Sequence, residues 1–398
     1  MPAYLSPGVF VEEVDSGARP IEAVGTSTAG FVGAAPLADA HLDEAVAINN
    51  WTQFQREFVG DSVASSPLAN AVYGFFLNGG SRCYVVNTKG PISGKGRGLD
   101  ALAYIDEVAI IAAPGMTDPA SYSALLDSAE LLKDRVAILD GPAMSVDVEP
   151  LTRASEIGGP AAAAAPGVKD TPPKRPGGLR CRDSDGGYGA YYFPWIKARD
   201  AITDEIVQVA PSGHIAGIYA RTDTERGVHK APANEAIRGA LGVTQNVSRA
   251  EQDQLNPAGV NCIRFFSREG VRVWGARTVA PSASNWRYLN VRRLFNMVEE
   301  SIGASTRWVV FEPNDRPLWK SIQRDVGAFL TLLWRQGALQ GASPREAFFV
   351  KCDEETNPQD VIDAGQVVTL IGMAPVKPAE FVIFRIGQSQ AGVTVETT

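Results

Sequence analysis

The alternation of hydrophobic and polar positions predicts strands and helices in alternating order through the first half of the chain. Short runs rich in Val, Ile and aromatic residues are typical of buried strands, and apolar residues three and four apart are typical of helices. A strand–helix–strand order indicates a partly parallel sheet covered by helices. Strand-like runs occur at 81–88, 106–115, 135–143 and 189–196, and helical spacing occurs at 121–134 and within 211–223.

Two amphipathic helices are predicted in the last third, with a short strand at 305–313 between them. The first covers 285–302. The second begins at Asn314 or Asp315, either of which can cap a helix, and runs to about Gly337. Its apolar stripe faces a core and its other side is cationic. The stripe consists of Leu318, Ile322, Val326, Phe329 and Leu333, and the cationic side of Arg316, Lys320, Arg324 and Arg335.

Both chain ends have the composition of β-strands, although termini are usually polar and frayed. "YLSPGVFVEEV" lies near the start and "PAEFVIFRI" near the end. We therefore expect each end to pair as a strand with another segment. The strand-forming residues are Val9, Phe10 and Val11 at the start and Phe381, Val382, Ile383 and Phe384 at the end.

The segment 158–178 differs from the rest of the chain. Gly, Pro and Ala fill 15 of its 21 positions, so it offers little apolar surface to bury. We expect a surface insertion within a domain.

Composition and charge narrow the class of protein. Hydrophobic residues make up 45% of the 398 residues and charged residues 21%, as in a soluble globular protein. The net charge of −8 argues against nucleic-acid binding. No apolar run suggests membrane insertion and no export signal is evident, so four scattered cysteines indicate reduced thiols in a protein made in the cytosol.

No motif assembles a catalytic, cofactor or metal site. "GKGRG" (94–98) lacks the spacing of a phosphate-binding loop and is better interpreted as a flexible loop. "PSGHIAG" holds a Ser and His214 without a nucleophile elbow, so a structural histidine is favoured. "CRDSDGGYG" lacks calcium-loop spacing, and no cysteine pair has zinc-ligand spacing.

Positive charge is concentrated in one block. Residues 286–345 hold nine Arg or Lys against five acids, whereas 346–398 hold three against eight. A charged stripe alone is typical of any solvated helix. A cationic block in an acidic chain favours an acidic partner instead.

Several ordered motifs resemble the contractile tail sheath family of myophages, R-type pyocin-like particles and extracellular contractile injection systems. They span most of the chain, with the weakest similarity at 89–190. The motifs are "YLSPGVFVEEV" (4–14), "PSGHIAGIYARTD" (211–223), "GVHKAPANE" (227–235), "LNPAGVNCIRFFSREGVRVWGART" (255–278), "WRYLNVRRL" (286–294), "FEPNDRPLW" (311–319), "FFVKCDEETNP" (348–358) and "PAEFVIFRI" (378–386).

The resemblance implies a structural protein and no enzyme. Sheath subunits of this family stack as six-membered rings around an inner tube in a metastable helix, and contraction drives the tube through a target envelope. The implied partners are further copies, the inner tube protein, and baseplate and terminator or cap proteins. The implied location is a phage tail or tail-like particle assembled in the bacterial cytoplasm and, in some members, released.

The resemblance also assigns roles to particular residues. The terminal arms would add strands to neighbouring subunits by β-augmentation, with Gly17 and Pro20 near the bend of the first arm. Lys320, Arg324 and Arg335 would face the inner tube.

The fold class expected is mixed α/β, a multi-domain sheath protomer. Residues 25–281 would form an outer α/β domain. The arm 1–24 and residues 282–398 would form an inner α+β assembly domain with a C-terminal arm. Two alternatives remain: a cytosolic oligomeric α/β enzyme that binds a nucleotide, and another tail component such as the tube, which would be shorter and would not need the helix at 314–337.

Overall fold

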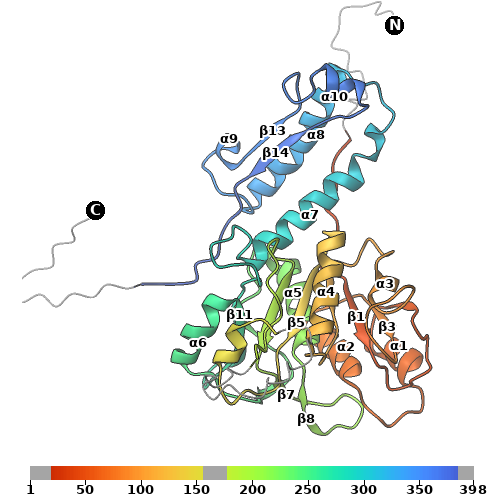
Figure 1. Ribbon diagram of the computed structural model, residues 1–398, viewed down its shortest axis with the longest axis vertical. Helices are drawn as coiled ribbons and strands as arrows, with labels where there is room; N and C mark the ends of the chain where they lie inside the picture. Colours follow the sequence, from red (N-terminus) through yellow and green to blue (C-terminus); the bar gives the residue numbers. More distant parts are fainter. Residues whose placement is uncertain (1–18, 156–176, 384–398) are drawn as a thin grey trace, which may run out of the picture.

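The computed structural model describes residues 19–155 and 177–383. Two units stand apart in Figure 1: a sheet unit, β1 to β12, and a small unit, α8 to β14, with helix α7 running from one into the other. The predicted arm strand Val9–Val11, Gly17, Phe384 and most of the insertion 158–178 lie outside the described residues.

A nine-stranded sheet forms the centre of the sheet unit. Its strand order is β2-β3-β1-β4-β5-β6-β11-β12-β9. The neighbours from β3 to β11 run parallel, and the strands at both edges are antiparallel, which confirms the predicted partly parallel sheet. The strands are β1 (Ala29–Gly33), β2 (Ala45–Ile48), β3 (Cys83–Asn87), β4 (Ile110–Ala112), β5 (Val136–Asp140), β6 (Gly189–Phe193), β9 (Glu235–Ala236), β11 (Val260–Phe266) and β12 (Gly270–Trp274).

Both faces of this sheet are buried. Along β5, Val136 and Ile138 point into one core while Ala137 and Leu139 point into the other, because successive side chains of a strand alternate between faces. Helices α2 and α5 cover the first core, and α3, α4 and α6 cover the second. The helices are α2 (Pro67–Leu77), α3 (Leu99–Leu102), α4 (Pro119–Leu132), α5 (Ser212–Arg226) and α6 (Arg249–Leu255).

Glycines let α2 and α5 approach each other closely. A Cβ at Gly213 would lie 2.2 Å from the carbonyl oxygen of Ala71, and one at Gly217 would lie 2.4 Å from that of Phe75. The "PSGHIAG" motif is therefore a packing surface. The other elements of the unit are α1 (Trp51–Phe54), the π-helical turn η1 (Gln55–Val59), the 3-10 turns η2 (Glu149–Thr152) and η3 (Asn256–Ala258), and a small sheet of β7 (Ile196–Arg199), β8 (Ile206–Val209) and β10 (Ala240–Val243).

The small unit has a core of its own. The predicted helices are confirmed as α7 (Leu289–Ser305) and α8 (Arg316–Arg335), and all five residues of the predicted apolar stripe of α8 are buried. The α8 stripe packs against the second half of α7 and a two-stranded sheet. That sheet is β13 (Phe348–Lys351) with β14 (Leu370–Met373), accompanied by α9 (Pro344–Ala347) and α10 (Gln359–Asp363).

The strand predicted at 305–313 is wrong. Residues Arg307–Val309 form the 3-10 turn η4 instead, and Phe311 adopts a φ of 71° with its side chain fully exposed. Apolar residues alone do not make a strand, and within the described chain no other strand lies alongside this segment.

Candidate functional site

Helix α8 presents the predicted cationic face to solvent. Asp315 caps the helix, its side chain accepting a hydrogen bond of 3.0 Å from the backbone N–H of Leu318. Because the apolar stripe is buried, the opposite side is left outside. All four predicted cations, Arg316, Lys320, Arg324 and Arg335, are exposed.

Acidic residues of the same chain lie beside part of this face. Arg316 forms an ion pair with Glu354, and both line an open groove of about 400 Å³ together with Lys320. Arg324 Nε donates to Oδ1 of the buried Asp325 at 2.9 Å. The first turns of α8 therefore carry a mixed charge pattern, and Arg335 extends the positive face to the far end of the helix.

Two arginines that contribute to the cationic block in the sequence are not on the surface. Arg292 and Arg293 are each 3% exposed. The Arg292 guanidinium stacks over the ring of Trp286 at 4.1 Å, and its Nε donates to Asn296 Oδ1 at 2.6 Å. Counting charge in the sequence therefore overstated the cationic surface, because burial removes these two residues from it.

Arg293 joins α7 to the sheet unit through a buried ion pair. Its Nη1 and Nη2 lie 2.9 and 2.5 Å from the two carboxylate oxygens of Asp223 on α5. Thr26 Oγ1 donates to the same carboxylate at 2.6 Å, and Arg293 also donates to the Thr26 carbonyl at 3.0 Å. Two of the resembling motifs, 211–223 and 286–294, thus meet at one contact.

The residues near the amino-terminal end of the described chain run along α7. Ile21 is buried in the core of the small unit, and the backbone N–H of Val24 donates to Ser301 Oγ at 3.0 Å. Pro20, predicted near the bend of the arm, is exposed and lies in no helix or strand. The bend itself stays a prediction.

At the other end, Phe381, Val382 and Ile383 form no strand with any part of the chain that the structure describes. Their exposed fractions are 71%, 71% and 79%. In Figure 1 the chain passes from β14 back toward the sheet unit and then leaves the body of the molecule. Within the described residues, β13 and β14 pair only with each other, so one edge of each strand is open.

Just before the exposed residues, the Glu380 carboxylate is held by the sheet unit. Arg277 Nε and Nη2 lie 2.8 and 2.7 Å from its two oxygens. Asn256 Nδ2 donates to Oε1 at 3.0 Å, and the Tyr288 hydroxyl lies 3.4 Å from Oε2. Burial opposes ionisation, but the hydrogen bonds and charge of Arg277 hold the pKa of Glu380 below its usual value. Sequence reasoning missed this contact; one charge inside the apolar run "PAEFVIF" was its only signal.

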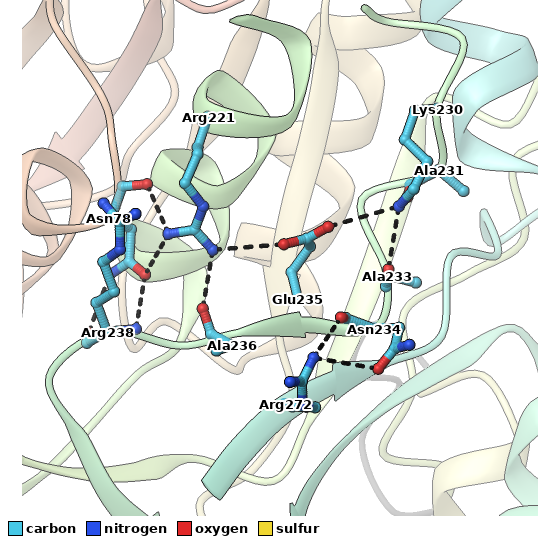
Figure 2. Close-up of polar contacts among 10 residues, drawn as sticks. All are labelled: Asn78, Arg221, Lys230, Ala231, Ala233, Asn234, Glu235, Ala236, Arg238 and Arg272. Atoms are coloured by element: carbon cyan, nitrogen blue, oxygen red, sulfur yellow. Dashed lines mark hydrogen bonds and ion pairs between the residues drawn. The ribbon is translucent and has the colours of Figure 1, made fainter. Parts of the chain in front are cut away.

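This contact lies in an open groove of about 590 Å³ beside α6 and the end of β12. The groove lining also includes the segment 231–234 that leads into β9, and Lys230 and Arg272 donate hydrogen bonds to its carbonyls (Figure 2). Arg221 Nη2 donates to the Ala236 carbonyl at 2.9 Å and lies 3.8 Å from Glu235, and Arg272 Nη1 donates to the Asn234 carbonyl at 2.7 Å. Cationic side chains therefore satisfy carbonyls of β9 and of the segment that leads into it.

The Ser–His pair of the α5 motif does not form a nucleophilic site. Ser212 Oγ donates to Asp140 Oδ2 at 2.7 Å, whereas His214 is buried against Gly74 of α2. Burial lowers the pKa of His214 to about 4, so it is neutral at physiological pH. In the described part, "GKGRG" lies in a loop, as predicted, that ends at the four-residue helix α3.

Two other kinds of feature are absent from the described residues. No group of three or more His, Cys, Asp or Glu side chains is placed to hold a metal ion. No helix among these residues has both the length and the apolar character needed to cross a bilayer.

Comparison with known proteins gives the family. A model of the phage tail sheath protein central domain matches residues 96–279, and one of the phage tail sheath C-terminal domain matches 282–389. A chain from the anti-feeding prophage baseplate is 31% identical with a TM-score of 0.74, over 98% of this chain and 100% of that one. This chain belongs to the phage tail sheath family.

Other tail sheath proteins are also similar to this chain. A chain from an extracellular contractile injection system, the PVC sheath complex in its contracted state, is 29% identical with a TM-score of 0.75, over 98% of this chain and 99% of that one. The tail sheath protein of Vibrio phage KVP40 is 31% identical over half of this chain, and a putative prophage major tail sheath protein of Pseudomonas aeruginosa strain UCBPP-PA14 is 29% identical over 48%. The matches cover 28% and 49% of those two proteins, so this sheath chain spans at most half of either.

Proposed function

We propose that the chain is the subunit of a contractile sheath, which polymerises as stacked six-membered rings around an inner tube and contracts to drive the tube through a target envelope. The observation that carries this proposal is the likeness, over 97% of this chain, to the anti-feeding prophage helical sheath in its contracted state. A whole-chain match to a protein in a helical assembly supports the same role here.

The chain ends supply the proposed links between subunits. Phe381, Val382 and Ile383 are exposed apolar residues with no partner strand among the described residues, where β13 and β14 also have open edges. An extended segment added to such an edge gains main-chain hydrogen bonds, with little dependence on the side chains of either partner. The arm strand Val9–Val11 is proposed to act in the same way.

The proposed partners beyond further copies are the tube, the baseplate and a terminator or cap. We assign Lys320, Arg324 and Arg335 to the tube, because they form the exposed side of a helix whose other side is buried. Exposed ion pairs contribute only about 0–1 kcal/mol each, so each subunit can release easily while many in register hold the extended form.

Charge reversal tests the tube contact. Lys320→Glu with Arg324→Glu, co-produced with the tube protein, should give empty cylinders, and wild-type extended assembly should weaken at high salt. Arg345→Glu is the control, since this exposed cation lies outside α8. Tube-filled extended sheath from the double variant would show that the stripe is solvated surface.

Negative-stain electron microscopy of the protein co-produced with its tube protein tests the function itself. The proposal expects long hollow cylinders. Small closed oligomers would favour the alternative, an oligomeric α/β enzyme.

A further inference from the structure

The end of the described chain combines a firmly held carboxylate with freely exposed apolar residues. Glu380 is 19% exposed at its side chain and Arg277 is 9% exposed. The next three residues are each more than two-thirds exposed. The chain is therefore bound at Glu380 and exposed from Phe381 to Ile383.

All the groups that hold Glu380 come from outside the small unit. Asn256 lies in η3, Arg277 follows β12, and Tyr288 precedes α7. The chain thus leaves β14 in the small unit, crosses to the sheet unit and is fixed there (Figure 1). A bidentate guanidinium–carboxylate contact fixes direction as well as position.

The groups that bind Glu380 are held in place by contacts of their own. Arg277 is oriented by two further contacts: its Nη1 donates to the Asn256 carbonyl at 3.1 Å, and its backbone N–H donates to Asn261 Oδ1 at 2.7 Å. Another part of the groove lining, the segment 231–234 that leads into β9, is held by Lys230 and Arg272 (Figure 2).

We propose that Glu380 and Arg277 form an anchor that sets where, and in which direction, the C-terminal arm leaves the protomer toward the next copy. The inference rests on the proposed function, since the arm is the link between copies. Its consequence is that the arm moves with the sheet unit, so a displacement of that unit is passed on to the neighbouring subunit.

The anchor makes few demands on the fold of the protomer, which allows a clean test. Glu380→Gln keeps the size of the side chain and removes its charge. Lys377→Gln, at an exposed position on the same segment, is the matched control. Lys377→Gln should match wild type in thermal unfolding, and Glu380→Gln should remain folded with a small loss of stability, because a Gln oxygen can still accept hydrogen bonds from Arg277 and Asn256.

The mobility of a spin label at Val382→Cys in the free protomer measures the anchor, because the four native cysteines are buried, and electron microscopy measures assembly. With Glu380→Gln added, we expect the rotational correlation time of the label to fall severalfold, because the ion pair no longer holds the chain two residues before it. We also expect cylinder formation to fall severalfold, with Lys377→Gln unchanged in both assays.

Two results would overturn the anchor: unchanged mobility of the label in Glu380→Gln, or higher mobility with wild-type yields of cylinders. Failure of the wild-type protein to form cylinders would instead overturn the proposed function, and with it the role of the arm as a link, while the mobility of the label still reports on the contact itself.

Discussion

The buried ion pair between Arg293 and Asp223 gives the strongest prediction about stability. Both side chains are at most 5% exposed, and the Asp223 carboxylate accepts two bonds from Arg293 and one from Thr26. In Arg293→Met, two charge-assisted hydrogen bonds disappear and a carboxylate stays buried with only Thr26 as a partner. Removing one partner of a buried pair costs about 3–5 kcal/mol, so we expect the free energy of unfolding to fall by that amount.

Urea unfolding of the purified protomer, followed by circular dichroism, measures this loss. Asp223→Leu combined with Arg293→Met is the control, since it leaves no uncompensated charge and should recover about 2 kcal/mol or more of the loss. Arg226→Met, on an exposed residue of the last turn of α5, should change the stability by less than about 0.5 kcal/mol. A loss below about 1 kcal/mol in Arg293→Met, or equal losses in single and double variants, would refute the reasoning.

Two further predictions concern the sheet unit. Burial raises the pKa of Asp140 to about 6 from 3.8, so the folded state binds a proton more tightly than the unfolded chain. The stability that proton binding to Asp140 contributes is therefore fully present below pH 3.8 and is lost as the pH rises through about 6. In urea unfolding, lowering the pH from 8 to 5 should stabilise wild type by about 1.4 kcal/mol relative to Asp140→Asn. The absence of this gain would contradict the assignment. Gly217→Ala should lower the free energy of unfolding by about 1–3 kcal/mol, because its Cβ would lie 2.4 Å from the Phe75 carbonyl oxygen. The control is Gly327→Ala in α8, whose Cβ would meet no atom within 4 Å and which should stabilise the protein by up to about 1 kcal/mol. Equal effects of the two variants in thermal unfolding would disprove the close packing.

Elements with a regular pattern over many residues were predictable from the sequence. The α8 stripe from Leu318 to Leu333 repeats over about four turns, and Asp315 provides a local capping signal, so both the helix and its buried face are confirmed. Four of the parallel strands, β3, β4, β5 and β6, were predictable as short apolar runs, and β4 and β5 also flank a segment with helical spacing. The parallel strands β1 and β11 were not among the predicted strands.

Features that depend on distant partners were not predictable. Arg292 and Arg293 have the sequence appearance of surface cations, and only the fold brings Trp286 and Asp223 against them. The apolar run before Phe311 failed as a strand because nothing in the described chain pairs with it. The Glu380 contact joins positions 103 residues apart, which no local pattern encodes.

Contraction itself is the central claim, and the dimensions of single particles test it most directly. Particles made with the tube protein are imaged before and after a mild denaturing shock, and the length and diameter of each cylinder are measured. The account expects two populations, a long narrow form with the tube enclosed and a shorter, wider form with the tube protruding. Cylinders of one fixed length and width under all conditions, or no cylinders at all, would contradict it.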